Sequence, residues 1–288
     1  MRKVRIACIQ AKADPRPERN LERAANSVRA AARRGARIVC LQELFRTPYF
    51  CRTESRSSFR LAETIPGPTT EAMGALARAL GVVIIAPVFE KRGRGLYHNS
   101  AAVLDADGKL LGRYRKMHIP DDPHFYEKFY FAPGDLGWPV FRTRYADIGV
   151  LICWDQWYPE AARLVALGGA EILFYPTAIG AVKSERPAEV RRQIAAWKTM
   201  HTAHAVANGI YVAAANRTGD EGVLRFWGSS LVAAPGGEML ALSRKKGEDA
   251  VLADCDLDRI TRLRQEWPFL RDRRIDAYRG LLSRYAGD

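Results

Sequence analysis

The sequence predicts a single α/β domain in which large sheets are covered by helices. Three observations support this fold class. The chain has 288 residues, which is long enough to bury a sizeable core. Strand and helix patterns alternate in its first part, and strands cluster in its second part. The runs 38–41 and 150–153 are apolar on both faces, as in strands that are packed on both sides.

The elements follow in order from hydrophobic spacing and from the residues that start and stop them. Gly35 and Gly209 each end an expected helix, and Asp107-Gly108 is a strong turn signal between two strands of a hairpin. Helices are expected at 17–34, 68–80, 159–167 and 187–208, with a short one before an Arg-rich end. Strands are expected at 4–10, 37–43, 82–89, 98–104, 110–116, 148–153, 172–176, 210–216, 229–234 and 250–256.

Residues 117–139 form an irregular stretch that is rich in prolines, aromatic residues and charges. A loop of this length inside a compact fold is usually functional. The sequence contains no internal linker, low-complexity tract or short repeat, so residues 1–288 are expected to form one domain.

Charge and cysteine content bear on the partners. Lys and Arg total 45 against 32 Asp and Glu, for a net charge of +13, but residues 1–37 alone hold eleven basic and three acidic residues. Most of these basic residues fall on the outer face of an amphipathic helix, without a recognisable RNA or DNA motif, so no nucleic-acid partner is expected. Five cysteines without zinc spacing indicate free thiols in a reducing compartment. The start lacks the apolar core of a signal peptide, and no apolar run approaches ~18 residues, so we expect a cytoplasmic protein that does not span a membrane.

The segment that begins at Gly149 reads Gly-Val-Leu-Ile-Cys-Trp-Asp-Gln-Trp-Tyr-Pro-Glu. An apolar strand ends on Cys153 and Pro159 opens a helix, so the thiol stands at the apex of a strand–turn–helix elbow. Free N–H groups of the turn and the positive end of the helix favour the thiolate, which is the nucleophilic form. A buried inert cysteine is the alternative interpretation. The polar pair Asp155-Gln156 is unexpected at a purely structural strand end.

Two further strands end on charged residues. Glu43 stands at a rim where ligands bind in α/β folds, and a carboxylate among apolar neighbours can serve as a general base. Lys116 leads into the irregular stretch, where an ammonium fixed beside a nucleophile stabilises a developing oxyanion. Taken alone, each is equally interpretable as an ordinary solvated residue at a strand end.

The joint pattern is more specific. In the segments Leu-Gln-Glu43, Arg-Lys116-Met-His-Ile-Pro and Ile-Cys153-Trp-Asp-Gln-Trp-Tyr-Pro-Glu, the chain resembles the nitrilase superfamily of carbon–nitrogen hydrolases, from its first strand to the tail near Asp272. The resemblance implies a four-layer αββα sandwich with Cys153 as nucleophile, Glu43 as general base and Lys116 as the oxyanion-stabilising cation. It also implies a homodimer or higher homo-oligomer. We expect the C-terminal tail, about 258–288, at a subunit interface.

Within the superfamily, the finer resemblance is to enzymes that act on N-carbamoylputrescine. Glu127 matches the second glutamate of the superfamily, which supports the lysine and the substrate amide. No metal or other cofactor is expected, since Lys116 fills the role of the cation. The supporting segments are 116–135, 175–180, 204–209 and 215–219. The further residues expected to bind or support the substrate are Trp154, through its backbone N–H, and Tyr49, His124, Thr177, Ala178 and Glu185.

The expected reaction is hydrolysis of a linear N-carbamoyl amine to amine, ammonia and carbon dioxide. A chain of net charge +13 does not steer a cationic substrate by its overall field, so recognition must be local. The segment 181–189 departs from the amine-specific relatives, because Lys183 and Arg186 stand among its acids. If Arg186 or Arg191 lines the pocket, a carboxylate-bearing substrate fits better: an N-carbamoyl amino acid, N-carbamoyl-β-alanine or an ω-amide. The candidate ammonium-binding carboxylates are Asp121, Asp122, Glu185 and Glu189, with Glu185 foremost.

Two other classes are alternatives. A metal hydrolase would use His201 and His204, which are spaced i, i+3 on one helix face. They also continue an apolar stripe through Trp197, so buried packing histidines are the favoured interpretation. A non-catalytic protein of this fold is disfavoured, because a decayed site would have lost at least one of the three charged or thiol residues.

Overall fold

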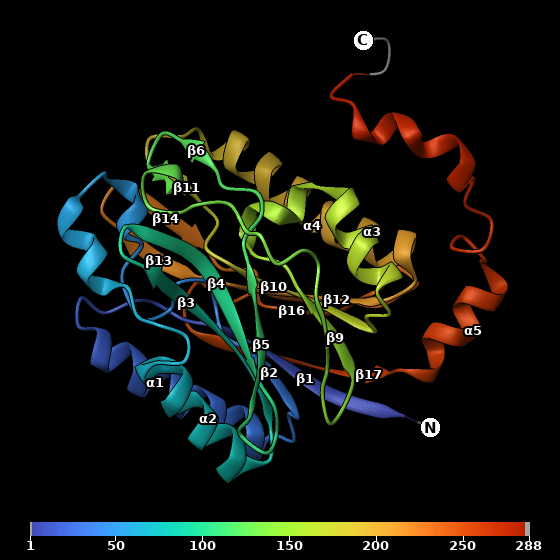
Figure 1. Ribbon diagram of the computed structural model, residues 1–288, viewed down its shortest axis with the longest axis horizontal. Coiled ribbons are helices and arrows are strands. Elements are labelled where there is room, and N and C mark those ends of the chain that lie inside the picture. Colours follow the sequence, from blue (N-terminus) through green and yellow to red (C-terminus); the bar gives the residue numbers. More distant parts are fainter. Residues whose placement is uncertain (1, 286–288) are drawn as a thin grey trace.

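The computed structural model describes residues 2–285; Met1 and residues 286–288 of the expected domain and tail lie outside the described part. Two six-stranded sheets lie face to face, and two helices cover the outer face of each (Figure 1). The predicted four-layer αββα sandwich is confirmed. The helices over the first sheet are α1 (Pro17–Arg33) and α2 (Pro68–Leu80), and those over the second are α3 (Pro159–Leu167) and α4 (Pro187–Asn208).

The first sheet contributes two strand ends to the site. Its order is β17-β1-β2-β3-β4-β5, with β1, β2 and β3 parallel and the remaining pairs antiparallel. The register sets Ile38 beside both Ile6 and Val83. The strands are β1 (Lys3–Gln10), β2 (Ile38–Cys40), β3 (Val83–Gly93), β4 (Leu96–Leu104), β5 (Leu110–Arg115) and β17 (Asp249–Asp256).

The second sheet has the order β16-β15-β12-β10-β9-β8, with β9, β10 and β12 parallel. Smaller sheets, β11-β14-β13 and β6-β7, frame the site. The strands of the second sheet are β8 (Val140–Arg142), β9 (Asp147–Val150), β10 (Ile172–Thr177), β12 (Tyr211–Asn216), β15 (Leu231–Ala233) and β16 (Met239–Leu242). The short strands are β6 (Asp121–Asp122), β7 (Phe125–Tyr126), β11 (Gly180–Val182), β13 (Thr218–Glu221) and β14 (Leu224–Trp227).

The core has two layers because alternate residues of β1 point to opposite faces. Ile6 and Cys8 pack against the second sheet, whereas Ala7 and Ile9 pack against α1 and α2. All four are essentially inaccessible to solvent. Burial of a side chain the size of isoleucine contributes about 1.5–3 kcal/mol, so both faces of the strand stabilise the sandwich.

Local sequence fixes the helix bounds. Each of the four helices named above begins with proline, which is pre-shaped for the first helical turn and loses no needed N–H there. Gly81 and Gly209 follow α2 and α4 with φ of +62° and +58°, a left-handed conformation that favours glycine. The predicted bounds of α2, α3 and α4 are confirmed, and α1 ends one residue early. The short helix α5 (Asp258–Glu266) is also present.

Several strand predictions were wrong in extent, including that over 229–234, which is observed only over Leu231–Ala233. The strand predicted over 37–43 is observed only over Ile38–Cys40, because the chain then turns and Leu44 has a φ of +49°. The strand expected to reach Cys153 ends at Val150. The strand expected over 82–89 continues to Gly93 through polar residues that pair with β4. The β13–β14 hairpin was not predicted, since each of its strands has only four residues and β13 consists of polar residues and glycine.

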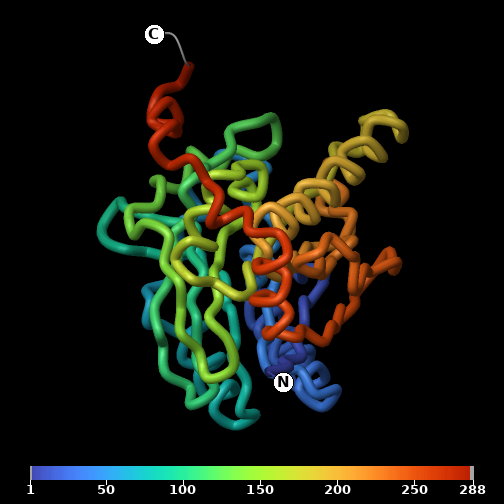
Figure 2. Tube along the Cα trace, turned by 90° about the vertical axis from the view of Figure 1, so that its right-hand side faces the viewer, coloured from blue at the N-terminus to red at the C-terminus, as the bar shows by residue number. Residues whose placement is uncertain are grey.

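The tail after α5 runs away from the body of the molecule (Figures 1 and 2). It contains the 3-10 helix η5 (Ile275–Leu282), and its apolar side chains face solvent; Leu282 is 90% exposed. Across residues 2–285, we find no helix that combines the length and the apolar character needed to cross a bilayer.

Candidate active site

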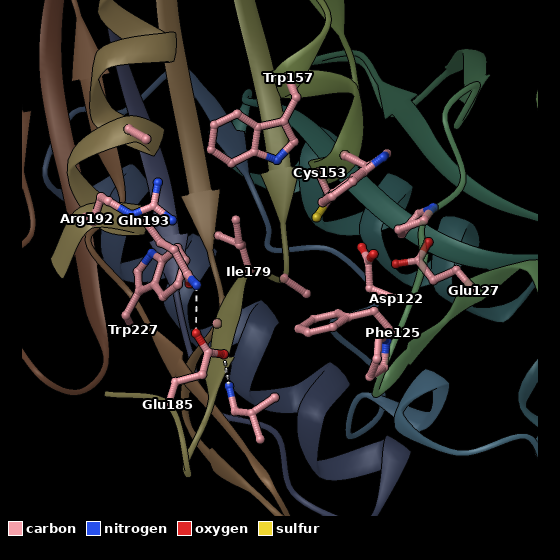
Figure 3. A pocket seen from close by; sticks show the side chains of 17 residues that line it. Asp122, Phe125, Glu127, Cys153, Trp157, Ile179, Glu185, Arg192, Gln193 and Trp227 are labelled. Atoms are coloured by element: carbon pink, nitrogen blue, oxygen red, sulfur yellow. Dashed lines mark hydrogen bonds between the residues drawn. The ribbon is translucent and has the colours of Figure 1, made fainter. Parts of the chain in front are cut away.

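Cys153 stands at the turn between β9 and α3. It begins the 3-10 helix η4 (Cys153–Trp157), and its φ of +45° lies in a region that non-glycine residues rarely adopt. Such backbone strain is typical of functional sites. The residue is 5% exposed, and Figure 3 shows its sulfur directed into a cavity. The chain therefore forms the predicted elbow, but the strand ends at Val150 rather than at the cysteine, and the turn begins earlier than predicted.

Glu43, Lys116 and Glu127 form a buried charged cluster. Lys116 Nζ donates to Glu43 Oε1 at 2.9 Å and to Glu127 Oε2 at 2.7 Å. Glu43 follows β2, Lys116 follows β5, and Glu127 begins the 3-10 helix η3 (Glu127–Phe129). The charges of all three act on Cys153. The fold thus brings the glutamate, lysine and cysteine singled out in the sequence to one place.

Asn99, on β4, belongs to this cluster and was missed by the sequence reasoning. Its side-chain amide donates to Glu43 Oε1 at 2.7 Å and to Glu127 Oε2 at 3.5 Å. Tyr49 OH donates to the other oxygen of Glu127, Oε1, at 2.8 Å. Glu43 Oε2 is buried and has no hydrogen-bond partner within residues 2–285, so one oxygen of this carboxylate remains available to accept a proton. The run of polar residues 98–100 near the start of an otherwise apolar strand was the feature that could have indicated a role for Asn99.

Burial decides the protonation states of the site. Desolvation alone would lower the pKa of Lys116, but the carboxylates of Glu127 and Glu43 outweigh it and raise that pKa well above its usual value. Burial raises the pKa of Glu127 to about 7; Lys116 limits this rise and Glu43 adds to it.

The burial of Cys153 opposes the local groups that were expected to favour its thiolate. Burial raises the pKa of the Cys153 thiol well above its ordinary range, and the charge of Glu43 adds to the shift while Lys116 opposes it. The loss of solvent therefore outweighs the N–H groups and helix end that were expected to favour the thiolate. A base must remove the proton when the sulfur reacts.

Asp155 ties the elbow to the segment that contains Lys116. Its Oδ2 accepts hydrogen bonds from the Ile152 N–H at 2.9 Å and from Tyr114 OH at 2.8 Å. Its Oδ1 accepts from the His118 backbone N–H at 3.0 Å and lies 2.7 Å from His118 Nδ1. Tyr114 and His118 flank Lys116 in the chain, so this buried carboxylate fixes the lysine segment against the elbow. The unexpected polar pair after the cysteine is thereby partly explained.

A cavity of about 510 Å³ opens beside Cys153 (Figure 3). Of the sequence-predicted set, Glu127, Trp154, Ala178 and Glu185 line it. Most of its wall is aromatic or aliphatic, which suits an alkyl chain. The apolar lining includes Phe125, Trp157, Ile179, Val182 and Trp227.

Three other members of the predicted set are not among the residues that line this cavity in the described chain. Tyr49 lies behind Glu127 and supports it. Thr177 Oγ1 donates to the Tyr175 carbonyl at 3.0 Å. The His124 ring lies 6.3 Å from the ring of Tyr126.

Glu185 marks the part of the cavity away from the thiol, whereas Figure 3 draws Asp122 on the side of Cys153. Figure 3 shows Glu185 across the cavity from Cys153. Its two oxygens accept from the Val182 N–H and from Gln193 Nε2, both at 2.7 Å. Glu185 and Asp122 both line the cavity, and neither forms an ion pair with a cation within residues 2–285. The carboxylate of Glu185, which has no cationic partner among the described residues, favours a positively charged group at the far end of the cavity.

Among the described residues, Arg192 is the arginine that lines the cavity; Arg186 and Arg191, on which the carboxylate-bearing alternative was conditional, do not line it. Arg192, Gln193 and Ala196 lie on the face of α4 that turns toward the cavity. Arg192 is also bonded to Glu189, with Nε 3.2 Å from Glu189 Oε2. Within the described chain, the candidate acids Asp121 and Glu189 do not line the cavity.

His201 and His204 lie on α4 with their side chains buried in the core. His201 Nδ1 bonds the Trp197 carbonyl and His204 Nε2 bonds the Gln156 carbonyl, each at 2.8 Å. Burial lowers the pKa of both rings, that of His201 to about 3, so both are neutral. In the part of the chain that the structure describes, no three His, Cys, Asp or Glu side chains are grouped as metal ligands.

Comparison with known proteins gives a consistent result. The family model of carbon–nitrogen hydrolase matches residues 5–265. The chain is 45% identical to an N-carbamoylputrescine amidase of Solanum lycopersicum over 98% of this chain and 96% of the relative. It is 37% identical to a citrullinase of Francisella tularensis over 99% and 100% of the two chains. The crystal structure of a carbon–nitrogen hydrolase from Helicobacter pylori G27 is 45% identical, with a TM-score of 0.95 over 99% of this chain and 100% of that one.

Proposed function

The chain belongs to the carbon–nitrogen hydrolase family, and on that premise we propose that it hydrolyses N-carbamoylputrescine to putrescine, ammonia and carbon dioxide. One observation carries the choice of substrate. The cavity has Cys153 on one side, the unpaired carboxylate of Glu185 on the other, and apolar walls between them. A ureide, an ammonium and the tetramethylene chain that joins them match these three regions. The 45% identity to the amidase of Solanum lycopersicum supports the same substrate.

In the proposed mechanism, Glu43 takes the thiol proton through its free oxygen, Oε2, as Cys153 sulfur attacks the ureide carbon. The raised pKa of the thiol makes this base necessary. The tetrahedral oxyanion is stabilised by Lys116 and by the backbone N–H of Trp154; loss of one such donor typically costs about 3 kcal/mol of barrier.

The second half of the reaction reuses the same groups. Glu43 passes its proton to the departing nitrogen, and the carbonyl stays on Cys153 as a thioester. Glu43 then removes a proton from water, which attacks the thioester carbon. The C–S bond breaks, a carbamic acid leaves, and Glu43 returns the proton to the Cys153 sulfur. Loss of carbon dioxide from that acid gives the same products whether ammonia or the amine leaves first.

The nucleophile is tested by mass spectrometry of the Cys153 peptide after incubation with a panel of ureides and amides. We expect a covalent adduct on this residue, and Cys153→Ala and Cys153→Ser are expected to abolish both the adduct and turnover. Near-wild-type turnover in either variant would refute the assignment.

The distal site is tested with Glu185→Gln. One charge-assisted bond to the ammonium is worth about 1.5–3 kcal/mol, so kcat/KM for N-carbamoylputrescine should fall about 10–100-fold. N-butylurea, which lacks the ammonium, should be hydrolysed equally by both proteins. The control is Glu71→Gln on α2, remote from the cavity. An unchanged ratio between the two substrates would contradict the role of Glu185.

A zwitterionic ureide such as citrulline is the second candidate, because Arg192 also lines the cavity. Its guanidinium can bind a carboxylate next to the ammonium that Glu185 binds, if it exchanges its bond to Glu189. The citrullinase of Francisella tularensis supports this candidate. Arg192→Gln should then lower kcat/KM for citrulline and leave N-carbamoylputrescine unaffected. A tenfold preference for citrulline or N-carbamoyl-β-alanine over N-carbamoylputrescine would overturn the first choice.

We also propose that the tail, about 258–288, lies at an interface between copies of the chain in a homodimer or higher homo-oligomer. Its exposed apolar residues include Ile275, Leu281 and Leu282, and a second copy would remove them from water. Sedimentation of the full chain and of a chain that ends after Glu266 tests this. Equal oligomeric states would contradict it.

We also propose that the protein is located in the reducing cytoplasm, on the evidence of its cysteines. All five cysteines are free and buried, and the proposed nucleophile must stay reduced. Fractionation of cells with an antibody against the chain is the direct test, and recovery outside the cytoplasm would refute it.

A further inference from the structure

Arg217 places a fully buried guanidinium behind Glu43. Its Nη2 donates to the carbonyls of Glu43 at 3.1 Å and Leu44 at 2.8 Å. Its Nη1 donates to the Thr47 carbonyl at 3.0 Å and to Glu221 Oε1 at 2.6 Å. A buried cation is tolerated only when it is paired and hydrogen-bonded, and this one directs three of its four bonds to the turn that carries Glu43.

That turn is strained. Leu44 has a φ of +49°, a conformation that leucine rarely adopts and that costs of the order of 1–2 kcal/mol. The bond from Arg217 to the Leu44 carbonyl holds this conformation, and the bond to the Glu43 carbonyl fixes the residue from which the carboxylate projects. Without the guanidinium, the turn can relax and the carboxylate moves with it.

Glu221 extends the same support to the second glutamate. Its Oε2 accepts the Tyr49 N–H at 2.5 Å, and Tyr49 OH donates to Glu127 Oε1 at 2.8 Å. Lys116 joins Glu127 to Glu43, so the contacts close a ring. In order, the ring runs through Arg217, Glu43, Lys116, Glu127, Tyr49 and Glu221.

The ion pair has a rigid base. Arg217 and Glu221 are four residues apart; Arg217 immediately precedes β13, and Glu221 is its last residue. The Phe226 ring of β14 lies under the guanidinium at 5.5 Å. Neither charged residue lines the cavity in the described chain, so neither is placed to touch substrate.

We propose that the Arg217–Glu221 ion pair is a positioning device that holds both active-site glutamates at Lys116 and thereby sets how readily Glu43 takes the proton of Cys153. The inference rests on the proposed role of Glu43 as general base. Both residues act through others, and they are positioning residues.

The test uses Arg217→Lys and Glu221→Gln in the full chain. The matched control is Glu171→Gln, because Glu171 accepts from a guanidinium, that of Arg2, and from a backbone N–H, that of Asp147, far from the cavity. The readouts are kcat and KM on N-carbamoylputrescine, and the rate at which iodoacetamide alkylates Cys153 across pH, located by mass spectrometry.

In both positioning variants, we expect kcat to fall at least 30-fold with KM within threefold of wild type. The alkylation rate at pH 7 should fall at least tenfold, and its pH midpoint should shift by at least 0.5 unit. The control should stay within twofold in every readout. A purely structural role would lower the folded fraction without moving the alkylation midpoint of the folded protein.

Unchanged alkylation profiles and kcat in Arg217→Lys and Glu221→Gln would overturn the inference. If Glu221→Gln does not fold, Tyr49→Phe opens the ring at one hydroxyl, and it must then show the same shift in alkylation midpoint. If alkylation changes as expected but the wild-type chain does not hydrolyse N-carbamoylputrescine, the choice of substrate fails and the positioning role stands.

Discussion

Replacement of Lys116 by methionine removes the ammonium that bridges two buried carboxylates. Its bonds to Glu43 and Glu127, at 2.9 and 2.7 Å, are charge-assisted and worth about 1.5–3 kcal/mol each. Breaking one partner out of a buried ionic cluster typically costs about 3–5 kcal/mol, and we expect a loss of that size at neutral pH. An oxyanion donor is lost as well, so kcat should fall at least about 1000-fold.

The pH dependence separates this explanation from a packing defect. Without the ammonium, two buried carboxylates face each other, and the folded variant keeps a proton that the unfolded chain releases. Such a group destabilises the fold more as pH rises, so the loss should be larger at pH 8 than at pH 5. Urea titration at the two pH values measures this, and ammonia release measures kcat. Lys109→Met, in the exposed β4–β5 turn, is the control and should change stability by less than about 0.5 kcal/mol. A kcat within tenfold of wild type, or an equal stability loss at both pH values, would refute the reasoning.

Three further outcomes are expected. Burial raises the pKa of Glu127 from 4.5 to about 7, so the free energy of unfolding should fall by roughly 3 kcal/mol as pH rises from 4.5 to 7. Urea titrations of Glu127→Gln should therefore show a flatter pH dependence of stability than wild type. Asp155→Asn replaces one hydrogen-bond-accepting oxygen with a donor amide. We expect kcat to fall at least tenfold and the free energy of unfolding to fall by about 1–3 kcal/mol. Asp107→Asn, in the exposed turn, should change neither quantity in the same assays. Gly81→Ala should cost about 1 kcal/mol in a thermal melt, because its φ is +62° while the space around it is open; an unchanged melt would contradict the backbone argument.

The sequence was sufficient where local rules act. Prolines at first helical positions and glycines after the last ones predicted α2, α3 and α4 to the residue. Candidate residues at strand ends could also be predicted, because a polar residue directly after an apolar strand lies at the rim of the sheet. Glu43, Lys116 and Cys153 were therefore identifiable as candidates before any contact was known.

The remainder depends on contacts between distant segments. Asn99 and Asp155 are ordinary polar residues in their own segments and acquire roles only from partners elsewhere in the chain. Arg217 reaches Glu43 across 174 positions, which no spacing rule anticipates. The local turn favours the thiolate of Cys153, whereas burial, a property of the whole fold, raises the pKa of the thiol.

The catalytic residues are divided between the two sheets, so neither sheet alone can form the active site. Glu43 and Lys116 follow strands of the first sheet, whereas Cys153 follows a strand of the second, and Arg217 reaches back from the second to the first. A fragment that retains only one sheet lacks either the sulfur or its base. Two fragments cut near Gly137, in the connection that precedes β8, would each be inert. Turnover would return only when they reassemble, so turnover measures whether the two sheets have come together.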